Sequence, residues 1–396
     1  MKLFRNARVI PYLTEGFSGS LADLLVEGRF VKAILPVGTA DCPEETEILD
    51  LHGKTVLPGL FDLHMHLYFS TEDFHVLGAK SQNEYVFDAI RYAGEFLRQG
   101  FTTIRDCGNV FDIGIALRDA VVAGTVPGPR IFTAGKCLTP TAKGNSTFPN
   151  LYDEVNTPEE ILKAVRKEHA KGVDFIKYMA TGSVANLNGE PGELITTRAE
   201  VFALQAAAES VGKYAGVHCH GKEGILLCAE AGIRTVEHAS MMDDECIELI
   251  LRKGGKTSIV PTLDPVVQLH RGHECGALPP ALFRKIDQVY AHAADLVRAT
   301  RAGVLTGWGT DSSCSFYARN VGYEFDVRRE VGYTNEEILK QATINSARIL
   351  GLEDCLGTLR AGKLADLVIV EGNPDEDILA MCRYPWAVYL EGRRCY

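Results

Sequence analysis

Eight short apolar runs alternate with longer amphipathic stretches through the middle of the chain, and this alternation limits the possible folds more than any other feature. The runs read VLPGLFDLHMH, FTTIRD, RIFTAG, DFIKYMA, AGVHCH, RTVEHA, TSIVPT and VLTGWGTD. Strands of a parallel sheet are buried on both faces and therefore read as nearly continuous apolar segments. Eight consecutive strand–helix units predict an α/β chain with a (β/α)8 or TIM barrel. The alternative is a doubly wound open sheet, which needs a glycine-rich phosphate turn after its first strand. This sequence has no such turn.

The segments between the apolar runs carry the patterns of helices. Two of them read EYVFDAIRYAGEFLRQG and TPEEILKAVRKEHAKG, and the last one reads NEEILKQATINSARILGL. In the second, Thr157 can cap the helix, Pro158 takes the first helical position, and Glu160 stands three residues after the cap. This combination satisfies backbone N–H groups that a helix start leaves free. We therefore expect a helix from Pro158 onward.

Both ends of the chain differ from the middle. Short β-type runs separated by glycine-containing turns fill the first part, and GTLRAGKLADLVIVEGN and WAVYLEGRRCY have the same character near the C-terminus. We expect the two ends to form one small β-sandwich. The predicted domains are the N-terminal part of the sandwich at 1–56, the barrel at 57–356, and the C-terminal part of the sandwich at 357–396.

The composition is that of a globular protein with an acidic surface. Apolar residues make up 46% and charged residues 23% of the 396 residues, and the formal net charge is −11. Binding to nucleic acid calls for a basic patch, so this class of partner is not expected. No apolar stretch approaches the roughly 18 residues of a membrane span. The N-terminal MKLFRNARVI lacks the pattern of a signal peptide.

The eleven cysteines contain no CxxC pair and suggest no disulfide framework. This usage is typical of a reducing compartment, so we expect a cytoplasmic protein. The expected partner is a small-molecule substrate. Helices around a barrel often support assembly, which makes a homo-oligomer a further expectation.

Ionisable side chains cluster at the C-terminal ends of the predicted strands, where the active site of a barrel lies. They are His64 and His66 on the first strand, Lys177 on the fourth, His218 and His220 on the fifth, Glu237 and His238 on the sixth, and Asp311 on the eighth. Five of the eleven histidines belong to this set. Histidines at i and i+2 share one face of a strand, because strand side chains alternate.

Each of these residues has an ordinary interpretation when it is taken alone. A histidine at a strand end can be a hydrogen-bonded rim residue, Lys177 can extend its ammonium group to water or pair with a carboxylate, and Asp311 can belong to a turn or cap a helix. Together, those interpretations would require that polar groups from five strands reach the same mouth of the barrel by coincidence.

A metal centre explains the residue types. Imidazole nitrogens and carboxylate oxygens suit Zn²⁺ and similar divalent ions. Two such ions about 3.5–4 Å apart can share a hydroxide that is nucleophilic at neutral pH. The pair needs an anionic bridge, and a lysine supplies one when its amine reacts with CO₂ to form a carbamate. Burial favours this reaction because it lowers the pKa of a lysine ammonium group and so exposes the neutral amine.

Over nearly its whole length the chain resembles the amidohydrolase superfamily. PGLFDLHMH is similar to the metal motif of its first strand, and DFIKYMATGS to the segment that carries its carboxylated lysine. GVHCHGKEGI, RTVEHA and LTGWGTDS resemble its strands five, six and eight, and GTLRAGKLADLVIVEGNP resembles the return into its small β domain. Within the superfamily, the chain resembles the imidazolonepropionase-related branch that includes metal-dependent Xaa-Pro dipeptidases.

The resemblance implies a role for each strand-end residue. His64 and His66 would bind the more buried of two metal ions, and His218 and His238 the other. Lys177 would carry the carbamate that bridges them. Asp311 would bind the first ion and carry a proton from the bridging water to the leaving amine.

Further residues are expected around the substrate. His220 shares a strand face with His218, so it is a substrate-side residue or the ligand itself. Arg319 and Asn320 follow the eighth strand, where a substrate carboxylate could be held. Asp62 shares the face of the two first-strand histidines and is a candidate to orient one of their rings.

One loop departs from the pattern of the dipeptidases. They usually carry a Gly-Gly-His segment after the third strand, whereas the comparable stretch here is CLTPTAKGNSTFP. Lys143 and Asn145 are the candidates to replace the missing histidine. The departure makes a dipeptidase a less secure expectation than a hydrolase.

The expected function is therefore that of a binuclear metal-dependent hydrolase that cleaves an amide of a dipeptide or an N-acyl amino acid. The alternative is a mononuclear deaminase or an imidazolonepropionase-like hydrolase of cyclic amides. Those enzymes usually place a Glu two to three residues after the fifth-strand histidine and lack the fourth-strand lysine. Here Cys219, His220 and Gly221 follow His218. A non-catalytic scaffold is the third possibility, but such proteins have typically lost metal ligands.

Overall fold

The computed structural model describes residues 1–185, 188–274 and 280–396. The chain divides into two compact units. Each unit combines segments that are distant in sequence. The first unit comprises Met1–Asp62, Ala93–Thr103 and Ala318–Tyr396, and the second comprises Leu63–Tyr92 and Ile104–Tyr317.

The first unit contains a sheet built from both ends of the chain, as the sequence predicted. Its strand order is β17-β16-β15-β5-β1-β2-β3, and β4 pairs with β1. The two ends meet where β5 pairs antiparallel with β15, and the rings of Phe4 and Tyr389 pack edge to face across them at 5.0 Å. The strands are β1 (Lys2–Val9), β2 (Leu21–Glu27), β3 (Phe30–Pro36), β4 (Glu47–Asp50), β5 (Thr55–Pro58), β15 (Leu367–Val370), β16 (Ala387–Leu390) and β17 (Arg393–Arg394).

The helices of this unit include the segment predicted as the last barrel helix. Its N-cap is Thr334, whose side chain and that of Glu337 form a capping box. The segment is interrupted by a π-helical turn, where Ser346 Oγ donates to Gln341 O at 2.6 Å. The elements are η1 (Pro11–Leu13), α12 (Tyr323–Val331), α13 (Asn335–Lys340), the π turn η3 (Gln341–Asn345), α14 (Ser346–Leu350) and η4 (Ile378–Met381).

The barrel strands form two hydrogen-bonded groups, in the orders β6-β7-β8 and β10-β9-β11-β12-β13-β14. The pairs of the second group are parallel. Seven of the predicted strands are present, six of them as predicted and the first as described below. The strands are β6 (Leu60–Met65), β7 (Phe101–Asp106), β8 (Arg130–Thr133), β9 (Cys137–Thr139), β10 (Tyr152–Glu154), β11 (Ile176–Met179), β12 (Ala215–Cys219), β13 (Thr235–His238) and β14 (Ser258–Val260).

Two predicted strands differ in the structure. The run VLPGLFDLHMH is one strand in the prediction but two in the structure, because the chain passes from β5 to β6 at Gly59. A Cβ atom at Gly59 would lie 2.1 Å from Thr102 Oγ1, so the passage requires glycine. The eighth run forms no regular strand, yet its backbone is held on both sides: Gly307 N–H donates to Ile259 O at 2.9 Å, and Leu63 N–H donates to Trp308 O at 2.8 Å.

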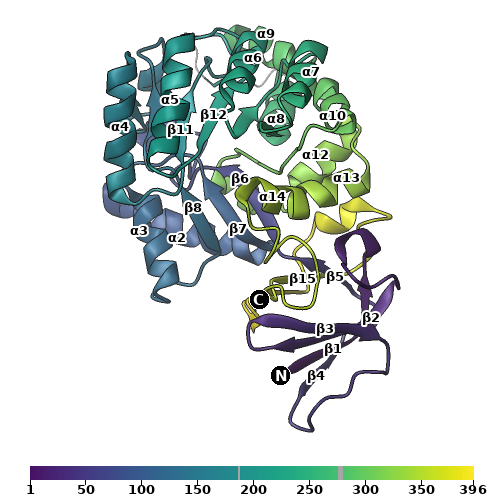
Figure 1. The fold of residues 1–396 in the computed structure, drawn as a ribbon. Helices are drawn as coiled ribbons and strands as arrows, with labels where there is room; N and C mark the ends of the chain where they lie inside the picture. Colours follow the sequence, from purple (N-terminus) through teal and green to yellow (C-terminus); the bar gives the residue numbers. More distant parts are fainter. Residues whose placement is uncertain (186–187, 275–279) are drawn as a thin grey trace. The chain divides into compact units, whose positions relative to one another are not determined.

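Helices follow the barrel strands, and successive ones pack against each other, as α4, α5, α6 and α7 do in Figure 1. The predicted cap is confirmed, since the Thr157 side chain accepts from Glu160 N–H. The helices are α1 (Phe74–Ala79), α2 (Gln82–Arg98), α3 (Ile113–Val122), η2 (Asn145–Thr147), α4 (Pro158–Lys171), α5 (Arg198–Ser210), α6 (Lys222–Ala231), α7 (Asp244–Arg252), α8 (Leu263–Glu274), α9 (Pro280–Tyr290), α10 (Ala293–Ala302) and α11 (Cys314–Arg319).

The predicted fold class, a (β/α)8 barrel with a small β domain formed by both termini, is confirmed. The compact units do not follow the predicted domain bounds, which stay a prediction. The cysteines in the described ranges are free thiols. Within the same ranges, the structure contains no helix with the length and apolar character that a membrane crossing requires.

Candidate metal centre

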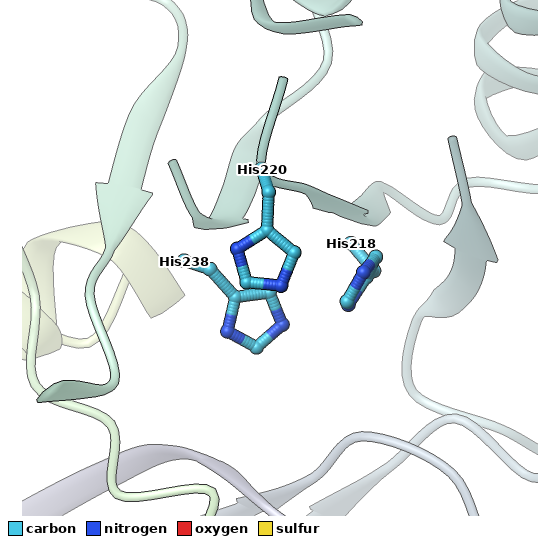
Figure 2. A group of neighbouring side chains, drawn as sticks. All are labelled: His218, His220 and His238. Carbon is cyan, nitrogen blue, oxygen red and sulfur yellow. The ribbon is translucent and has the colours of Figure 1, made fainter. Parts of the chain in front are cut away.

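The strand ends of the second unit bring together the histidines that the sequence predicted. His218, His220 and His238 each offer a ring nitrogen, and these atoms lie within 4.8 Å of one another (Figure 2). His64, His238 and Asp311 form a second group with the same spacing. His238 belongs to both groups. The barrel therefore gathers possible ligands from strands that are far apart in the sequence.

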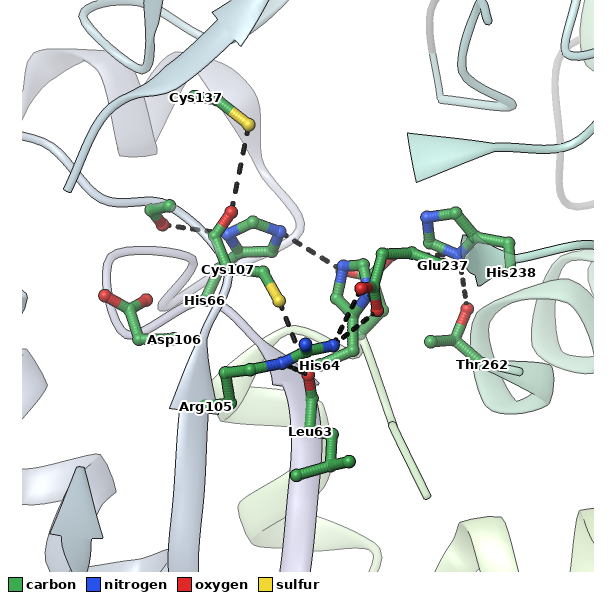
Figure 3. Close-up of polar contacts among 12 residues, drawn as sticks. Leu63, His64, His66, Arg105, Asp106, Cys107, Cys137, Glu237, His238 and Thr262 are labelled. Atoms are coloured by element: carbon green, nitrogen blue, oxygen red, sulfur yellow. Dashed lines mark hydrogen bonds and ion pairs between the residues drawn. The ribbon is translucent and has the colours of Figure 1, made fainter. Parts of the chain in front are cut away.

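The two histidines at the end of β6, His64 within it and His66 just after it, each have one ring nitrogen engaged. His64 Nδ1 lies 3.0 Å from Glu237 Oε2, and His66 Nδ1 lies 2.8 Å from Gly108 O (Figure 3). A carbonyl or carboxylate oxygen only accepts, so Nδ1 of both rings carries the proton. The Nε2 atoms are then left with their lone pairs, and both approach Asp311 Oδ1, at 3.6 Å and 3.5 Å.

The histidines at the ends of β12 and β13 also have one ring nitrogen each at hydrogen-bond distance from an oxygen atom. The nitrogen involved is not the same in all three rings. His218 uses Nε2, which lies 3.0 Å from Gly182 O. His220 Nδ1 lies 2.9 Å from Ser240 Oγ, and His238 Nδ1 lies 2.7 Å from Thr262 Oγ1. His218 therefore offers Nδ1 as a ligand, whereas His220 and His238 offer Nε2. Outer partners of this kind fix ring orientation in metal sites.

The five rings are held in the neutral form. Burial lowers the pKa of His66 to about 4 and that of His220 to about 3. Burial also lowers the pKa of His64, His218 and His238 well below the usual value, and the nearby charge of Lys177 contributes. A neutral imidazole keeps the lone pair that a metal ion needs, so the cluster is ready to coordinate at neutral pH.

The backbone is strained where the two groups meet. Asp311 has φ 53°, His238 has φ 68° and Ala239 has φ 52°, values that residues with a Cβ rarely adopt. Asp311 is fixed by its N–H, which donates to His64 O at 2.8 Å. Gly309 allows this approach, since a Cβ there would lie 2.7 Å from His64 Cβ. The strain aims the Asp311 carboxylate at the histidines.

Lys177 lies inside β11 and is buried. Among the described residues, its Nζ atom has no hydrogen-bond partner, and neither has Nε2 of His238. A buried polar atom without a partner is costly, commonly by about 1–3 kcal/mol. Two such atoms within a cluster of neutral imidazoles fit a site that holds a further group. Divalent metal ions match the nitrogen and oxygen donors present.

Sequence reasoning missed two buried charges beneath the cluster. Arg105 Nη2 lies 2.7 Å from each carboxylate oxygen of Glu237, and both side chains are fully buried (Figure 3). Glu237 in turn meets His64. The prediction noted Glu237 only as the neighbour of His238 and offered Asp62 as the carboxylate for the ring. Asp62 is buried on β6, and its role stays a prediction.

His64, Cys107 and Glu237 also come within 4.8 Å of one another. This group is a hydrogen-bonded network rather than a third ligand set. Glu237 already pairs with Arg105, burial raises the pKa of the Cys107 thiol, and that thiol donates to Leu63 O at 3.4 Å. A protonated thiol is a poor metal ligand.

The residues predicted to bind the substrate have fewer contacts that connect them with the histidine cluster. Lys143 and Asn145 line a small pocket together with Gly182, the residue whose carbonyl meets His218. Asn145 also supports its own loop, because its amide donates to Glu154 Oε1 at 2.8 Å. Arg319 and Asn320 belong to the first unit, so their assignment stays a prediction.

Comparisons with known proteins identify one family and several similar hydrolases. Residues 55–390 match the model of the amidohydrolase family. The ochratoxinase of Aspergillus niger is 27% identical over 350 residues, which cover 82% of this chain and 71% of the relative. The imidazolonepropionase of Symbiobacterium thermophilum is 25% identical over 411 residues, or 92% of this chain and 85% of the relative. A Xaa-Pro dipeptidase crystallised with methionine in its active site has a TM-score of 0.88 at 29% identity, with 99% of both chains covered.

Proposed function

The chain belongs to the amidohydrolase family, and from this membership and the histidine cluster we propose that it is a binuclear metal-dependent hydrolase of amide bonds. The expected resemblance to the imidazolonepropionase and Xaa-Pro dipeptidase branch is confirmed by the relatives found. The chain is a hydrolytic enzyme that acts on C–N bonds. The number of metal ions, the carbamate and the substrate belong to the proposal.

One observation carries the proposal: the buried Lys177 amine has no partner among the described residues, although five neutral histidines and a carboxylate surround the same strand ends. A purely structural lysine would pair with a carboxylate or reach water. An amine that becomes a carbamate would instead gain partners when two ions are bound.

The proposed ligand sets are those that the family resemblance implies. His64, His66 and Asp311 would hold one ion, and His218 and His238 the other, with the Lys177 carbamate between them. When bound, two ions supply Lewis-acid activation of water at neutral pH. His220 is the remaining member of its cluster. Its ring is oriented by Ser240, and we assign it to the substrate side.

Asp311 is the proposed proton carrier. Its carboxylate is 26% exposed, so it can reach both a water molecule and a substrate. It would accept a proton from the attacking water and deliver it to the leaving nitrogen, because an amine leaves readily only when protonated. The strained backbone at Asp311 holds the carboxylate in place for both transfers.

The proposed substrates are dipeptides and N-acyl amino acids, with Zn²⁺ as the expected metal. Two similarities support this class: the Aspergillus relative is an ochratoxinase, and a similar structure is that of a Xaa-Pro dipeptidase. The similarity to an imidazolonepropionase keeps cyclic amides as a second candidate class. Lys143, Asn145, Arg319 and Asn320 are the candidates to bind the substrate carboxylate.

A substrate panel tests the proposal. Metal-free and Zn²⁺-loaded protein are assayed against dipeptides, N-acyl amino acids and cyclic amides, next to His238→Asn and the control His292→Asn. His292 pairs with Asp295 on the surface, at 2.8 Å. We expect amide hydrolysis only with metal, its loss in His238→Asn and its retention in His292→Asn. Hydrolysis by metal-free protein would refute the metal-dependent mechanism, and activity confined to cyclic amides would refute the substrate class.

A further inference from the structure

We propose that the buried Arg105–Glu237 ion pair is a positioning device that fixes the proton of the His64 ring on Nδ1 and so keeps Nε2 free for a metal ion. The inference rests on the proposed function, because it takes His64 as a ligand. It assigns roles to two residues that the proposed reaction does not use. Neither residue touches the substrate, so both act through His64.

The pair is held in one geometry from every side. Arg105 Nη2 binds both oxygens of Glu237 at 2.7 Å, and its Nε donates to Leu63 O at 2.5 Å. Its Nη1 lies 3.1 Å from Thr235 Oγ1, which itself donates to Glu237 Oε1 at 2.5 Å. The guanidinium also packs over the ring of Phe175 at 5.0 Å.

The network connects strands that are distant in the sequence. His64 comes from β6, Arg105 from β7, and Glu237 from β13. Gly216 on β12 leaves the space for the carboxylate, because a Cβ there would lie 2.9 Å from Glu237 Oε1. Such a site depends on closure of the barrel and cannot form within a single strand pair.

His64 differs from the other histidines in the partner that fixes its ring. His238 and His220 meet hydroxyl groups, which can donate or accept. His66 and His218 meet carbonyl oxygens. Among the five, His64 is the one whose orienting hydrogen bond is made with a carboxylate, a group whose charge could also draw a second proton onto the ring. Arg105 neutralises that carboxylate, so Glu237 orients the ring without making an imidazolium.

The two oxygens of Glu237 share Arg105 as a partner, and replacing one of them by an amide nitrogen makes a sharp test. Oε1 meets Arg105 and Thr235, whereas Oε2 meets Arg105 and His64. In Glu237→Gln the side chain loses the charge that pairs with Arg105, and its N–H₂ group meets a donor of Arg105 whichever way the amide turns, because Nη2 lies 2.7 Å from both oxygen positions. The amide is therefore displaced from the guanidinium, His64 Nδ1 loses its fixed acceptor, and the ring proton can move to Nε2, where it blocks coordination.

Cobalt titration of metal-free protein provides the readout, because Co²⁺ bound by nitrogen and oxygen ligands absorbs visible light and needs no substrate. We expect Glu237→Gln to bind Co²⁺ about 10- to 100-fold more weakly than the wild type. In the double variant Arg105→Met/Glu237→Gln the amide is free to turn its oxygen to His64, so affinity should recover relative to the single variant. A merely structural role predicts no recovery.

The control is a second buried ion pair, Arg328–Glu324, in which both side chains are fully buried and Nε lies 2.7 Å from Oε1. It belongs to the first unit. Glu324→Gln removes the same charge and should lower the thermal unfolding temperature while leaving Co²⁺ affinity unchanged. Equal affinity of Glu237→Gln and wild type would overturn the inference, and so would a double variant weaker than the single one.

A second measurement needs no variant to fold. Nitrogen-15 spectra of histidine-labelled, metal-free wild type report which ring nitrogen carries the proton, and the His64 signal is expected from an Nδ1–H tautomer. An Nε2–H tautomer would overturn the inference. If wild type itself binds no Co²⁺ at this site, the proposed function fails. If it binds Co²⁺ and Glu237→Gln matches it, only the positioning role fails.

Discussion

The chain contains two His-x-His pairs at strand ends, and they differ in how their rings are held. In the β6 pair, His64 and His66 are both fixed through Nδ1, and both Nε2 atoms approach the same oxygen of Asp311. In the β12 pair, His218 is fixed through Nε2 and His220 through Nδ1. The same spacing in sequence therefore produces a matched pair on one strand and an unmatched pair on the other.

This difference in ring orientation indicates that the two pairs have different functional roles. Two rings that present the same atom to one carboxylate suit a shared metal ion, which we assign to His64 and His66. Two rings that present different atoms suit separate tasks. His218 Nδ1 would face the second ion, and His220 Nε2 would face the substrate. The spacing of the histidines alone cannot distinguish these cases, because it fixes only the strand face.

Removal of Lys177 is expected to have the largest effect, because Lys177 is the proposed ligand that both metal ions share. Lys177→Ala should lose most bound metal from both pairs and reduce hydrolysis to background. Short carboxylic acids with bicarbonate should restore part of the metal binding and of the hydrolysis. Metal analysis combined with an activity assay measures both quantities in the variant. Two ions and full activity in the variant would exclude a carbamate.

Asp311→Asn separates metal binding from proton transfer at the β6 pair. The amide keeps an oxygen for the metal but cannot carry a proton. We expect much of the metal to remain while kcat falls by about 10²–10⁴-fold, the usual contribution of a positioned acid–base group. Steady-state kinetics beside metal analysis measures both quantities. Wild-type turnover in this variant would make Asp311 a structural residue.

The β12 pair can be divided by two matched substitutions. His218→Asn should weaken the binding of one metal ion by at least about 10- to 100-fold. Loss of a residue that only orients a ligand already has an effect of that size, and His218 is a proposed ligand itself. His220→Asn should retain both ions and raise KM or lower kcat for the substrate. Metal titration and kinetics of the two variants distinguish them. If the two results are exchanged, His220 is the ligand and the asymmetric assignment of this pair is wrong.

The smallest expected effect concerns the pH dependence of stability in metal-free protein. His66 and His220 have folded pKa values of about 4 and about 3, against 6.5 in the unfolded chain. Between those values the unfolded state binds more protons, so stability is full above pH 6.5 and falls as the pH is lowered towards 4 for His66 and towards 3 for His220.

Urea unfolding of metal-free wild type and His220→Asn measures this contribution. Between pH 6.5 and pH 5 the variant should lose about 2 kcal/mol less of its free energy of unfolding than wild type, as expected for one proton over that interval. If the free energies of unfolding of the two proteins have parallel pH profiles, burial does not hold the His220 ring neutral. The β6 and β12 pairs would then differ in the charge of their rings.

The barrel strands and the strand-end residues could be predicted from the sequence because both follow local rules. Buried strands read as apolar runs, and polar groups such as Lys177 stand out within them. The eighth strand was predicted from the same apolar pattern, but its glycines allow the backbone to leave regular pairing, as at Gly309 against His64. The break at Gly59 was missed because a close approach to Thr102 leaves no pattern in sequence.

The outer partners of the histidines were beyond prediction, since they depend on barrel closure. Ser240 and Thr262 are ordinary hydroxyl residues in sequence, and nothing marks them as ring partners. Arg105 and Glu237 did leave a signal: each is a charge inside an apolar strand run, in FTTIRD and RTVEHA. Buried charges are rarely left unpaired, so two of them in strands of one barrel could have been proposed as a pair.

The number of metal ions that activity requires decides most directly whether the enzyme is binuclear. The metal-free protein is titrated with Zn²⁺ while bound metal and amide hydrolysis are followed together. We expect activity to rise to its maximum at two ions per chain and to be removed again by a chelator. Full hydrolysis without bound metal, or a maximum at a single ion, would contradict this expectation.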